Sequence, residues 1–205
     1  MSALTPLLTR RPEPTGPALA LLPSAPQLKL AQSRVHEACG TARRTLALWV
    51  AARTQGPVIW VTPPWVQEQL HCDGVASWID PARLIFVYPR RPEDVLWTME
   101  EILRAGAVAL AVADLPGLPG LTQVRRMHLA AETGMVEGRY APLGLLLTPG
   151  AGGAAGVETR WQLCPSHARG PEAWRLERLR ARTAPRQGWD IHRPHANASP
   201  EIKPA

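Results

Sequence analysis

The chain has 205 residues, 45% of them apolar, and a net charge of +6 with a pI near 10. This length and apolar content are enough for one domain with a hydrophobic core. No stretch approaches the roughly 18 consecutive apolar residues that cross a membrane, and three scattered cysteines argue against a disulfide framework. The charge would suit a polyanion such as DNA, although 21 of the 23 basic residues are arginines, which arginine-rich codon usage also produces.

A pair of arginines near the N-terminus gives a faint hint of an export signal. Arg10 and Arg11 precede a short apolar run, Ala18–Leu22, which Pro17 and Pro23 interrupt on either side. The run is too short for the apolar centre of such a signal. We therefore expect a soluble, cytoplasmic protein that has no membrane partner and whose cysteines stay reduced.

The first segment in chain order, residues 1–33, contains six prolines and little periodicity. We expect an extended proline-rich arm here, with one short helix or strand near residues 28–31 as its only regular element. Residues 34–193 have the pattern of a folded domain. Residues 194–205 are expected to be a disordered tail.

Apolar runs and amphipathic segments alternate through the middle of the chain. The apolar runs are short and uninterrupted, as is typical of parallel strands covered on both faces. Strands are predicted at residues 58–62, 84–88, 108–113 and 143–148. Helices are predicted at residues 45–53, 65–69, 92–105 and 122–133. This alternation predicts an α/β fold with a mostly parallel central sheet flanked by helices.

The pattern changes after Thr148. Residues 161–164, 174–182 and 189–192 have the composition of strands and are not separated by helical patterns. We expect them to add antiparallel strands to one edge of the sheet.

The segment HEACGTARRT, residues 36–45, is the candidate phosphate-binding loop, because a glycine turn before a helix exposes N–H groups to anions. A functional P-loop reads G-x-x-x-x-G-K-[ST]. Anchored on Thr45, this pattern places Arg44 at the lysine, Arg43 at the second glycine and Ala38 at the first, and leaves Gly40 out of register. A bulky Arg43 would obstruct the loop, and a planar arginine does not replace a compact lysine. The segment is either a degenerate nucleotide-binding loop or an ordinary strand-to-helix turn.

Other patterns that could carry chemistry are weaker. Residues 150–155 match the dinucleotide pattern G-x-G-x-x-A, but a strand-like segment follows them instead of a helix, so we expect a flexible loop. The histidines and cysteines lack the spacing of a zinc site, and we expect no metal and no cofactor. Asp114, at the end of a predicted strand, is well placed for magnesium, although an isolated acid there is more often a strand-end cap.

Taken in order, these segments resemble the RecA-type ATPase core, and more closely the ImuA family of RecA-related accessory proteins in bacterial damage-inducible mutagenesis. The similarity covers residues 34–192, and its most specific part is DPARLIFVYPRRPEDVLWTMEEILRAGAVALAVAD, residues 80–114. Shorter matching segments are RVHEACG, GPVIWV, LTQVRRMHLAAETG and WRLERLRARTAPRQGWDI. The resemblance implies a RecA-like core with antiparallel strands at its C-terminal edge.

The chain departs from RecA at the positions that perform hydrolysis. Arg43 and Arg44 replace the glycine and lysine of the P-loop, and residues 62–64 (Thr-Pro-Pro) stand where RecA has the acid that orients the attacking water. Asp114 is retained as the Walker B-like acid, while Thr148 replaces the glutamine that senses the γ-phosphate. Phosphoryl transfer depends on positioned charge, so the resemblance implies a degenerate P-loop and a protein that is not an enzyme.

The segments that match the DNA-binding loops and the terminal hairpin of RecA also differ. Residues 115–121 and 149–159 contain no lysine or arginine, so direct DNA binding is expected to be weak or indirect. Arg180 and Arg182 match two lysines that reach the ATP of a neighbouring RecA subunit, and strand alternation would place both on one face. They are candidate contacts for a partner or DNA, and a solvated basic edge is the alternative.

The resemblance implies a non-catalytic accessory or adaptor protein for SOS-induced, error-prone translesion DNA synthesis after DNA damage. Its implied partners are a Y-family polymerase-like protein and an error-prone C-family DNA polymerase of the mutagenesis cassette, with RecA as a further candidate. Two alternatives stay open: an active, DNA-binding RecA-like ATPase, and a cell-division inhibitor similar to SulA.

Overall fold

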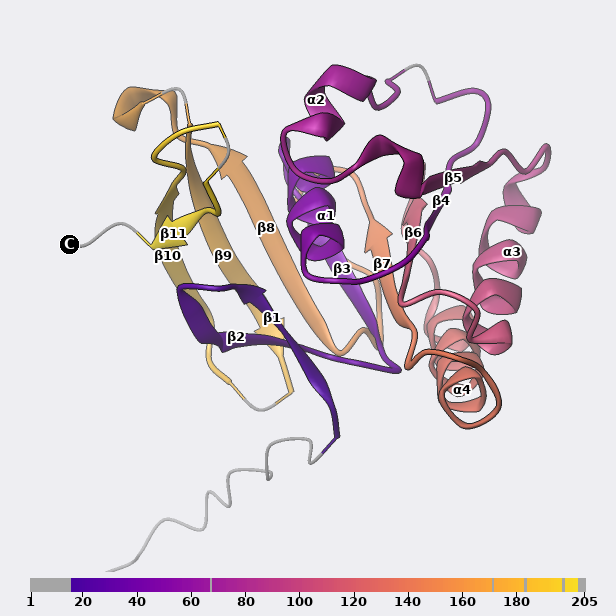
Figure 1. Ribbon diagram of the computed structural model, residues 1–205. Helices are drawn as coiled ribbons and strands as arrows, with labels where there is room; N and C mark the ends of the chain where they lie inside the picture. Colours follow the sequence, from indigo (N-terminus) through magenta and orange to yellow (C-terminus); the bar gives the residue numbers. More distant parts are fainter. Residues whose placement is uncertain (1–15, 67, 171, 183, 197, 203–205) are drawn as a thin grey trace, which may run out of the picture.

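Strands and helices alternate in the computed structural model, which describes residues 16–66, 68–170, 172–182, 184–196 and 198–202 (Figure 1). Within them, nine strands form one sheet in the order β11-β10-β9-β8-β3-β7-β6-β4-β5. The strands are β3 (Val35–Cys39), β4 (Val58–Val61), β5 (Leu84–Val87), β6 (Leu110–Asp114), β7 (Leu143–Leu147), β8 (Thr159–Pro165), β9 (Ala173–Ala181), β10 (Gln187–His192) and β11 (Glu201–Ile202). The four strands predicted in the middle of the chain are confirmed as β4, β5, β6 and β7.

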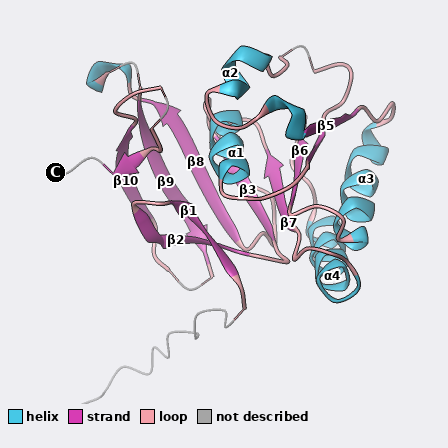
Figure 2. Ribbon diagram, viewed as in Figure 1, coloured by secondary structure: helices cyan, strands magenta, loops and turns pink. Residues whose placement is uncertain are grey.

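The sheet is parallel from β5 to β8 and antiparallel from β8 to β11 (Figure 2). The mostly parallel sheet predicted from the apolar runs is therefore confirmed. The C-terminal strands do extend one edge, but β8 itself runs parallel to β3, and antiparallel pairing begins only with β9.

Helices cover both faces of the sheet (Figure 1). Helix α1 (Arg43–Ala52) and the short α2 (Cys72–Ala76) lie on one face, and α3 (Pro92–Ala105) and α4 (Leu121–Glu137) lie on the other. Two short 3-10 helices, η1 (Pro81–Arg83) and η2 (His167–Arg169), occupy connections. Among the described residues, no helix combines the length and apolarity that crossing a membrane requires.

The helix predicted at residues 65–69 is wrong in its described part, because residues 65, 66, 68 and 69 are not helical and Gln67 lies outside the described residues. The segment forms one turn, in which the Val66 N–H donates to the Pro63 carbonyl. A five-residue stretch behind two prolines gains too few hydrogen bonds to offset the cost of nucleating a helix.

The N-terminal segment corrects a second prediction. Residues 1–15 lie outside the described residues. The short element expected near residues 28–31 is present as a strand, but β1 (Ala18–Leu22) and β2 (Ala25–Ala31) form an antiparallel hairpin instead of an extended arm. Leu21, Leu22, Leu28 and Leu30 are buried against the face that carries α1. Burial of these leucines stabilises the hairpin, at about 1.5–3 kcal/mol for each fully buried side chain.

The expected disordered tail is also wrong for part of its length. Ile202 of β11 pairs with Ile191 of β10, which orders residues 201 and 202 as an edge strand. Residues 197 and 203–205, which belong to the same expected tail, lie outside the described residues.

Two hydrophobic cores hold the layers together. The first lies between the sheet, α1 and the hairpin. It contains Trp49 and Trp174, whose rings meet edge to face with their centres 5.3 Å apart. The second lies between the sheet, α3 and α4. Gly134 lets these two helices approach closely, because a Cβ atom there would lie 2.0 Å from the Leu103 carbonyl oxygen.

Candidate functional site: an arginine–aspartate cluster at the strand ends

The candidate site lies at the carboxyl ends of β3 and β6, where open α/β sheets bind their ligands. Residues 40–42 connect β3 to α1, and Asp114 is the last residue of β6. Arg43 and Arg44 begin α1 and point their guanidinium groups at Asp114. The structure thus brings together three of the residues that the sequence indicated.

The connection between β3 and α1 is too short for a P-loop. Ala38, the residue at the first glycine of the pattern, lies inside β3, paired with Leu147 on one side and Trp161 on the other. In the pattern the loop would run from Ala38 to Arg43, but Ala38 and Cys39 are strand residues, so only residues 40–42 connect β3 to α1. The chain therefore has no room to wrap around a phosphate here.

The backbone amides of this connection are already hydrogen-bonded within the protein. The Gly40 N–H donates to the Gly150 carbonyl at 3.0 Å, the Ala42 N–H donates to the Leu163 carbonyl at 3.0 Å, and the Arg43 N–H donates to the Gly40 carbonyl at 3.3 Å. Gly40 has a φ of +86°, and a Cβ there would lie 2.5 Å from the Leu163 oxygen. Its glycine serves close contact with β8, and these amides are not free to receive an anion.

Arg44 is the internal counter-ion of Asp114. Its Nε and Nη2 both lie 2.6 Å from Asp114 Oδ2, and its Nη1 contacts Glu68. Arg43 adds a weaker contact, with its Nε 3.8 Å from Asp114 Oδ1. Burial acts to lower the pKa of Arg44, but the hydrogen bond to Glu68 and the charge of Asp114 outweigh it, so the pKa is raised. Arg44 therefore stays charged and neutralises the buried Asp114.

The cavity that Asp114 lines is small. A cavity of about 60 Å³ is lined by Arg44, Asp114 and Glu68 together with Trp60 and Tyr88. Pockets for small-molecule ligands usually measure roughly 300 Å³ or more. A larger cavity of about 370 Å³ lies toward α2, and it is lined by Arg44 and by Thr45, the hydroxyl of the P-loop pattern, but not by Asp114.

Sequence reasoning missed Glu68, because it lies in the segment that was predicted as a helix. It also missed Glu37, a fully buried carboxylate on β3. Glu37 Oε1 accepts hydrogen bonds from the Thr148 hydroxyl at 2.6 Å, the Gly153 N–H at 2.7 Å and the Ala154 N–H at 3.1 Å. Its Oε2 accepts one from Arg160 Nε.

The Glu37 contacts change the interpretation of two predicted features. Thr148, which the resemblance places at the position of the γ-phosphate sensor, donates its hydroxyl hydrogen bond to Glu37 of its own chain. The loop at residues 150–155, expected to be flexible, is anchored to β3 through two amides and carries the buried Ala154. Two of the four hydrogen bonds to the buried carboxylate come from this loop, and together with buried Ala154 they attach the loop to the core.

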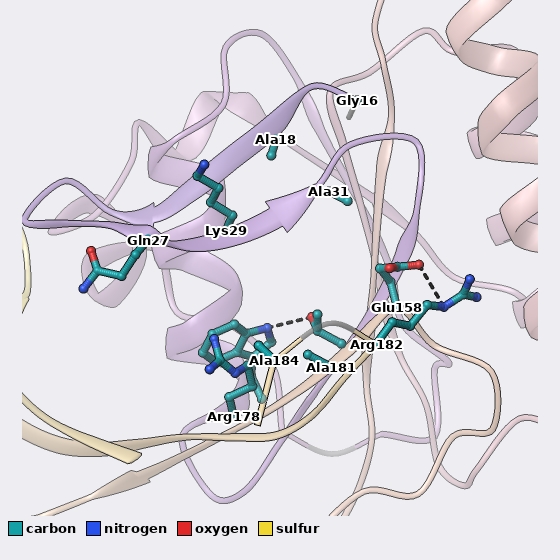
Figure 3. A pocket seen from close by; sticks show the side chains of 12 residues that line it. Gly16, Ala18, Gln27, Lys29, Ala31, Glu158, Arg178, Ala181, Arg182 and Ala184 are labelled. Atoms are coloured by element: carbon teal, nitrogen blue, oxygen red, sulfur yellow. Dashed lines mark hydrogen bonds and ion pairs between the residues drawn. The ribbon is translucent and has the colours of Figure 1, made fainter. Parts of the chain in front are cut away.

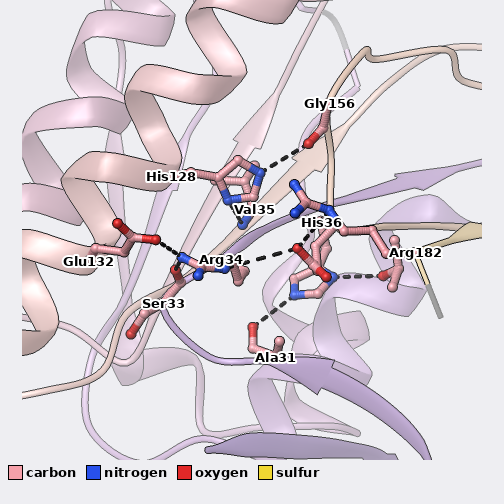
Figure 4. A network of polar contacts seen from close by, with 11 residues as sticks. Ala31, Ser33, Arg34, Val35, His36, His128, Glu132, Gly156 and Arg182 are labelled. Carbon is pink, nitrogen blue, oxygen red and sulfur yellow. Dashed lines mark hydrogen bonds and ion pairs between the residues drawn. The ribbon is translucent and has the colours of Figure 1, made fainter. Parts of the chain in front are cut away.

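Arg180 and Arg182 occupy different environments. Arg180 is exposed on β9 opposite Arg160, and has no ion pair among the described residues. Arg182 follows the end of β9, so strand alternation does not set its direction, and its Nε lies 3.3 Å from Glu158 Oε2. Figure 4 shows Arg182 in a polar network that also contains Arg34 and Glu132.

No three histidine, cysteine, aspartate or glutamate side chains of the described residues gather as metal ligands. A scan against models of known protein families and a search of curated proteins both gave no match to this chain.

Proposed function

We propose that the protein is a non-catalytic, RecA-like accessory protein of the ImuA type. It acts in the bacterial cytoplasm as an adaptor in SOS-induced, error-prone translesion synthesis, beside a Y-family polymerase-like protein and an error-prone C-family DNA polymerase. The observation that carries this proposal is the Arg44–Asp114 pair, which puts a protein cation where a RecA-like ATPase needs magnesium and phosphate.

Three independent features support the absence of hydrolysis. The connection between β3 and α1 is short, three of its amides are used within the chain, and Asp114 is neutralised by Arg44. Transfer of a phosphoryl group needs a metal ion, a positioned water and donors for the developing charge. A nucleotide would have to break the hydrogen bonds of these amides and the Arg44–Asp114 ion pair before it could bind.

An adaptor also needs a surface for its partners, and β5 supplies one at the edge of the sheet. Ile85 and Tyr88 are about half exposed, at 49% and 48%, and the rings of Phe86 and Tyr88 stack at 6.1 Å. An apolar edge strand presents unpaired N–H and C=O groups to which a partner strand can add. Exposed Arg90 and Arg91 follow β5, so we assign this edge to an extended partner segment with apolar side chains and an acidic flank.

ATP hydrolysis by the purified protein tests the loss of catalysis. We expect turnover at background, with and without single-stranded DNA, and the same result for Asp114→Ala. Turnover above background that Asp114→Ala abolishes would show an active site and contradict the proposal.

Co-purification with the Y-family polymerase-like partner tests the adaptor role. We expect Ile85→Lys, on the β5 edge, to abolish capture, because a buried charge would oppose strand addition. Val136→Lys on α4 is the matched control, since Val136 is also exposed, at 80%, and belongs to a helix instead of the β5 edge. Equal capture by both variants would remove the β5 edge from the proposal, and absence of capture by the wild type would remove the adaptor role.

DNA binding is a minor part of the proposed function. The loops at residues 115–120 and 149–158 carry no lysine or arginine, so we expect weak, non-specific binding that falls steeply as salt rises. Tight binding to single-stranded DNA at physiological salt, measured by fluorescence anisotropy, would contradict this.

A further inference from the structure

A third cavity, which shares no lining residue with the Arg44–Asp114 cluster, lies between the β1–β2 hairpin and strands β8 and β9. Its volume is about 130 Å³, several times the roughly 30 Å³ that a water molecule occupies in the liquid. Figure 3 shows Lys29 and Gln27 of the hairpin on one side, Arg178 of β9 on the other, and the Glu158–Arg182 pair at one end.

Arg178 is held in place at this cavity without an acidic partner. Its guanidinium carbon lies 5.7 Å from the ring centre of Trp161 and 5.3 Å from that of Trp189, and its Nε donates to the Pro185 carbonyl at 3.1 Å. Its Nη2 donates to Gln187 Oε1 at 3.5 Å, burial lowers its pKa, and no carboxylate of the described residues pairs with it. A half-buried cation with no counter-ion is under-stabilised, and it gains from an anion placed beside it.

The other charges of the lining reinforce the positive potential. Lys29 has no ion pair among the described residues, and Arg182 is paired with Glu158, the one carboxylate of the lining. The lining side chains therefore carry three positive charges and one negative charge. The excess of two matches a doubly charged anion.

We propose that this cavity is a binding site for a terminal phosphate group. Lys29 and Arg178 contact its oxygens from opposite walls, and Arg182 contributes at the end of the cavity. Arginine and lysine are the usual ligands of phosphate, which offers several acceptor oxygens to donors from different directions. The volume accommodates the phosphate group but not a nucleoside, which would have to lie outside the cavity.

A terminal phosphate can belong to a small molecule or to the end of a DNA strand, and the binding experiment distinguishes the two sources. Isothermal titration calorimetry measures the binding of inorganic phosphate and of AMP to the full chain. Fluorescence anisotropy compares a short single-stranded oligonucleotide with a 5′-phosphate against the same strand with a 5′-hydroxyl. Binding of the two small ligands identifies a small-molecule site, and preference for the 5′-phosphorylated strand identifies a strand-end site.

The lining residues are tested by charge removal. Lys29→Gln and Arg178→Gln should each weaken phosphate binding about tenfold, the effect of losing one charge-assisted hydrogen bond. Arg175→Gln is the matched control on β9, because alternation turns Arg175 to the opposite face, where it pairs with Asp190. Lys29 is exposed on a strand, so its variant keeps the test valid even where Arg178→Gln fails to fold.

The result expected is phosphate binding by the wild type and the control, and weakened binding by both cavity variants. The proposal is overturned by a wild type that binds none of the phosphate ligands at millimolar concentration, or by cavity variants that bind as tightly as the wild type. The site shares no residue with the Arg44–Asp114 cluster, so its failure and the failure of the adaptor function are separate outcomes.

Discussion

Acidification from about pH 8 to about pH 5 should destabilise the fold through His36, a fully buried side chain of β3. The Trp161 indole N–H donates to Thr159 Oγ1 at 2.7 Å, which leaves the Thr159 hydroxyl proton to donate to His36 Nδ1 at 2.7 Å. His36 Nε2 then donates to the Ala31 carbonyl at 2.9 Å (Figure 4). Every donor and acceptor in this series of hydrogen bonds has a partner only while His36 is neutral.

The size of the effect follows from the shifted pKa. Burial, aided by the nearby charges of His128 and Arg34 and opposed by the hydrogen bond to Ala31, lowers the pKa of His36 from 6.5 to about 4. Between these values the unfolded chain binds a proton that the folded chain does not, so stability falls as the pH falls. The loss should be about 2 kcal/mol by about pH 5 and about 3 kcal/mol once the pH reaches about 4.

Urea unfolding followed by tryptophan fluorescence measures this loss in the wild type and in His36→Gln. Glutamine can still donate to the Ala31 carbonyl but does not titrate. His128, whose pKa is also lowered by burial, is present in both proteins, so its contribution cancels in the difference between their unfolding free energies. The difference in unfolding free energy between the two proteins should shrink by about 2 kcal/mol from about pH 8 to about pH 5. A difference that stays constant across this range would show that His36 does not carry the pH dependence.

Three further predictions concern the same scaffold. Asp114→Asn should lower the unfolding free energy by about 3 kcal/mol in urea, because it removes the counter-ion of Arg43 and leaves Arg44 paired only with the exposed Glu68; an unchanged value would make the cluster dispensable. Gly134→Ala should cost about 2 kcal/mol or more, since its Cβ would overlap the Leu103 carbonyl, and an unshifted melting temperature would contradict the close helix contact. The double variant Arg43→Gly/Arg44→Lys should still not bind ATP in calorimetry, and tight binding would show that the short connection is no obstacle.

The parallel sheet could be predicted because its signals are local. Strands β4 to β7 are short, continuously apolar runs, and α3 begins and ends as expected because Pro92 stands at its first position and Gly106, with a φ of +56°, ends it. The hairpin was missed because its prolines are turn signals, whereas its stability comes from leucines that are buried by distant elements.

The candidate site could be predicted only in part, for the same physical reason. Arg43, Arg44 and Asp114 stand out through comparison with a known pattern, but the pattern does not show that the arginines reach the acid. Glu37 gives no signal within HEACG, because its four partners lie between 111 and 123 residues further along the chain. A buried acid in a strand becomes intelligible only when those partners are known.

The contacts at the Arg44–Asp114 cluster also explain why no single substitution would open this place to a nucleotide. Freeing Asp114 for magnesium requires removal of Arg44, which leaves a buried carboxylate unpaired until a metal arrives. Freeing the amides of residues 40, 42 and 43 requires separation of the β3–α1 connection from β8 and from the loop after β7. Glu37 holds that loop in turn, through the amides of residues 153 and 154. Each contact that a nucleotide would have to displace is therefore also a contact that stabilises the fold.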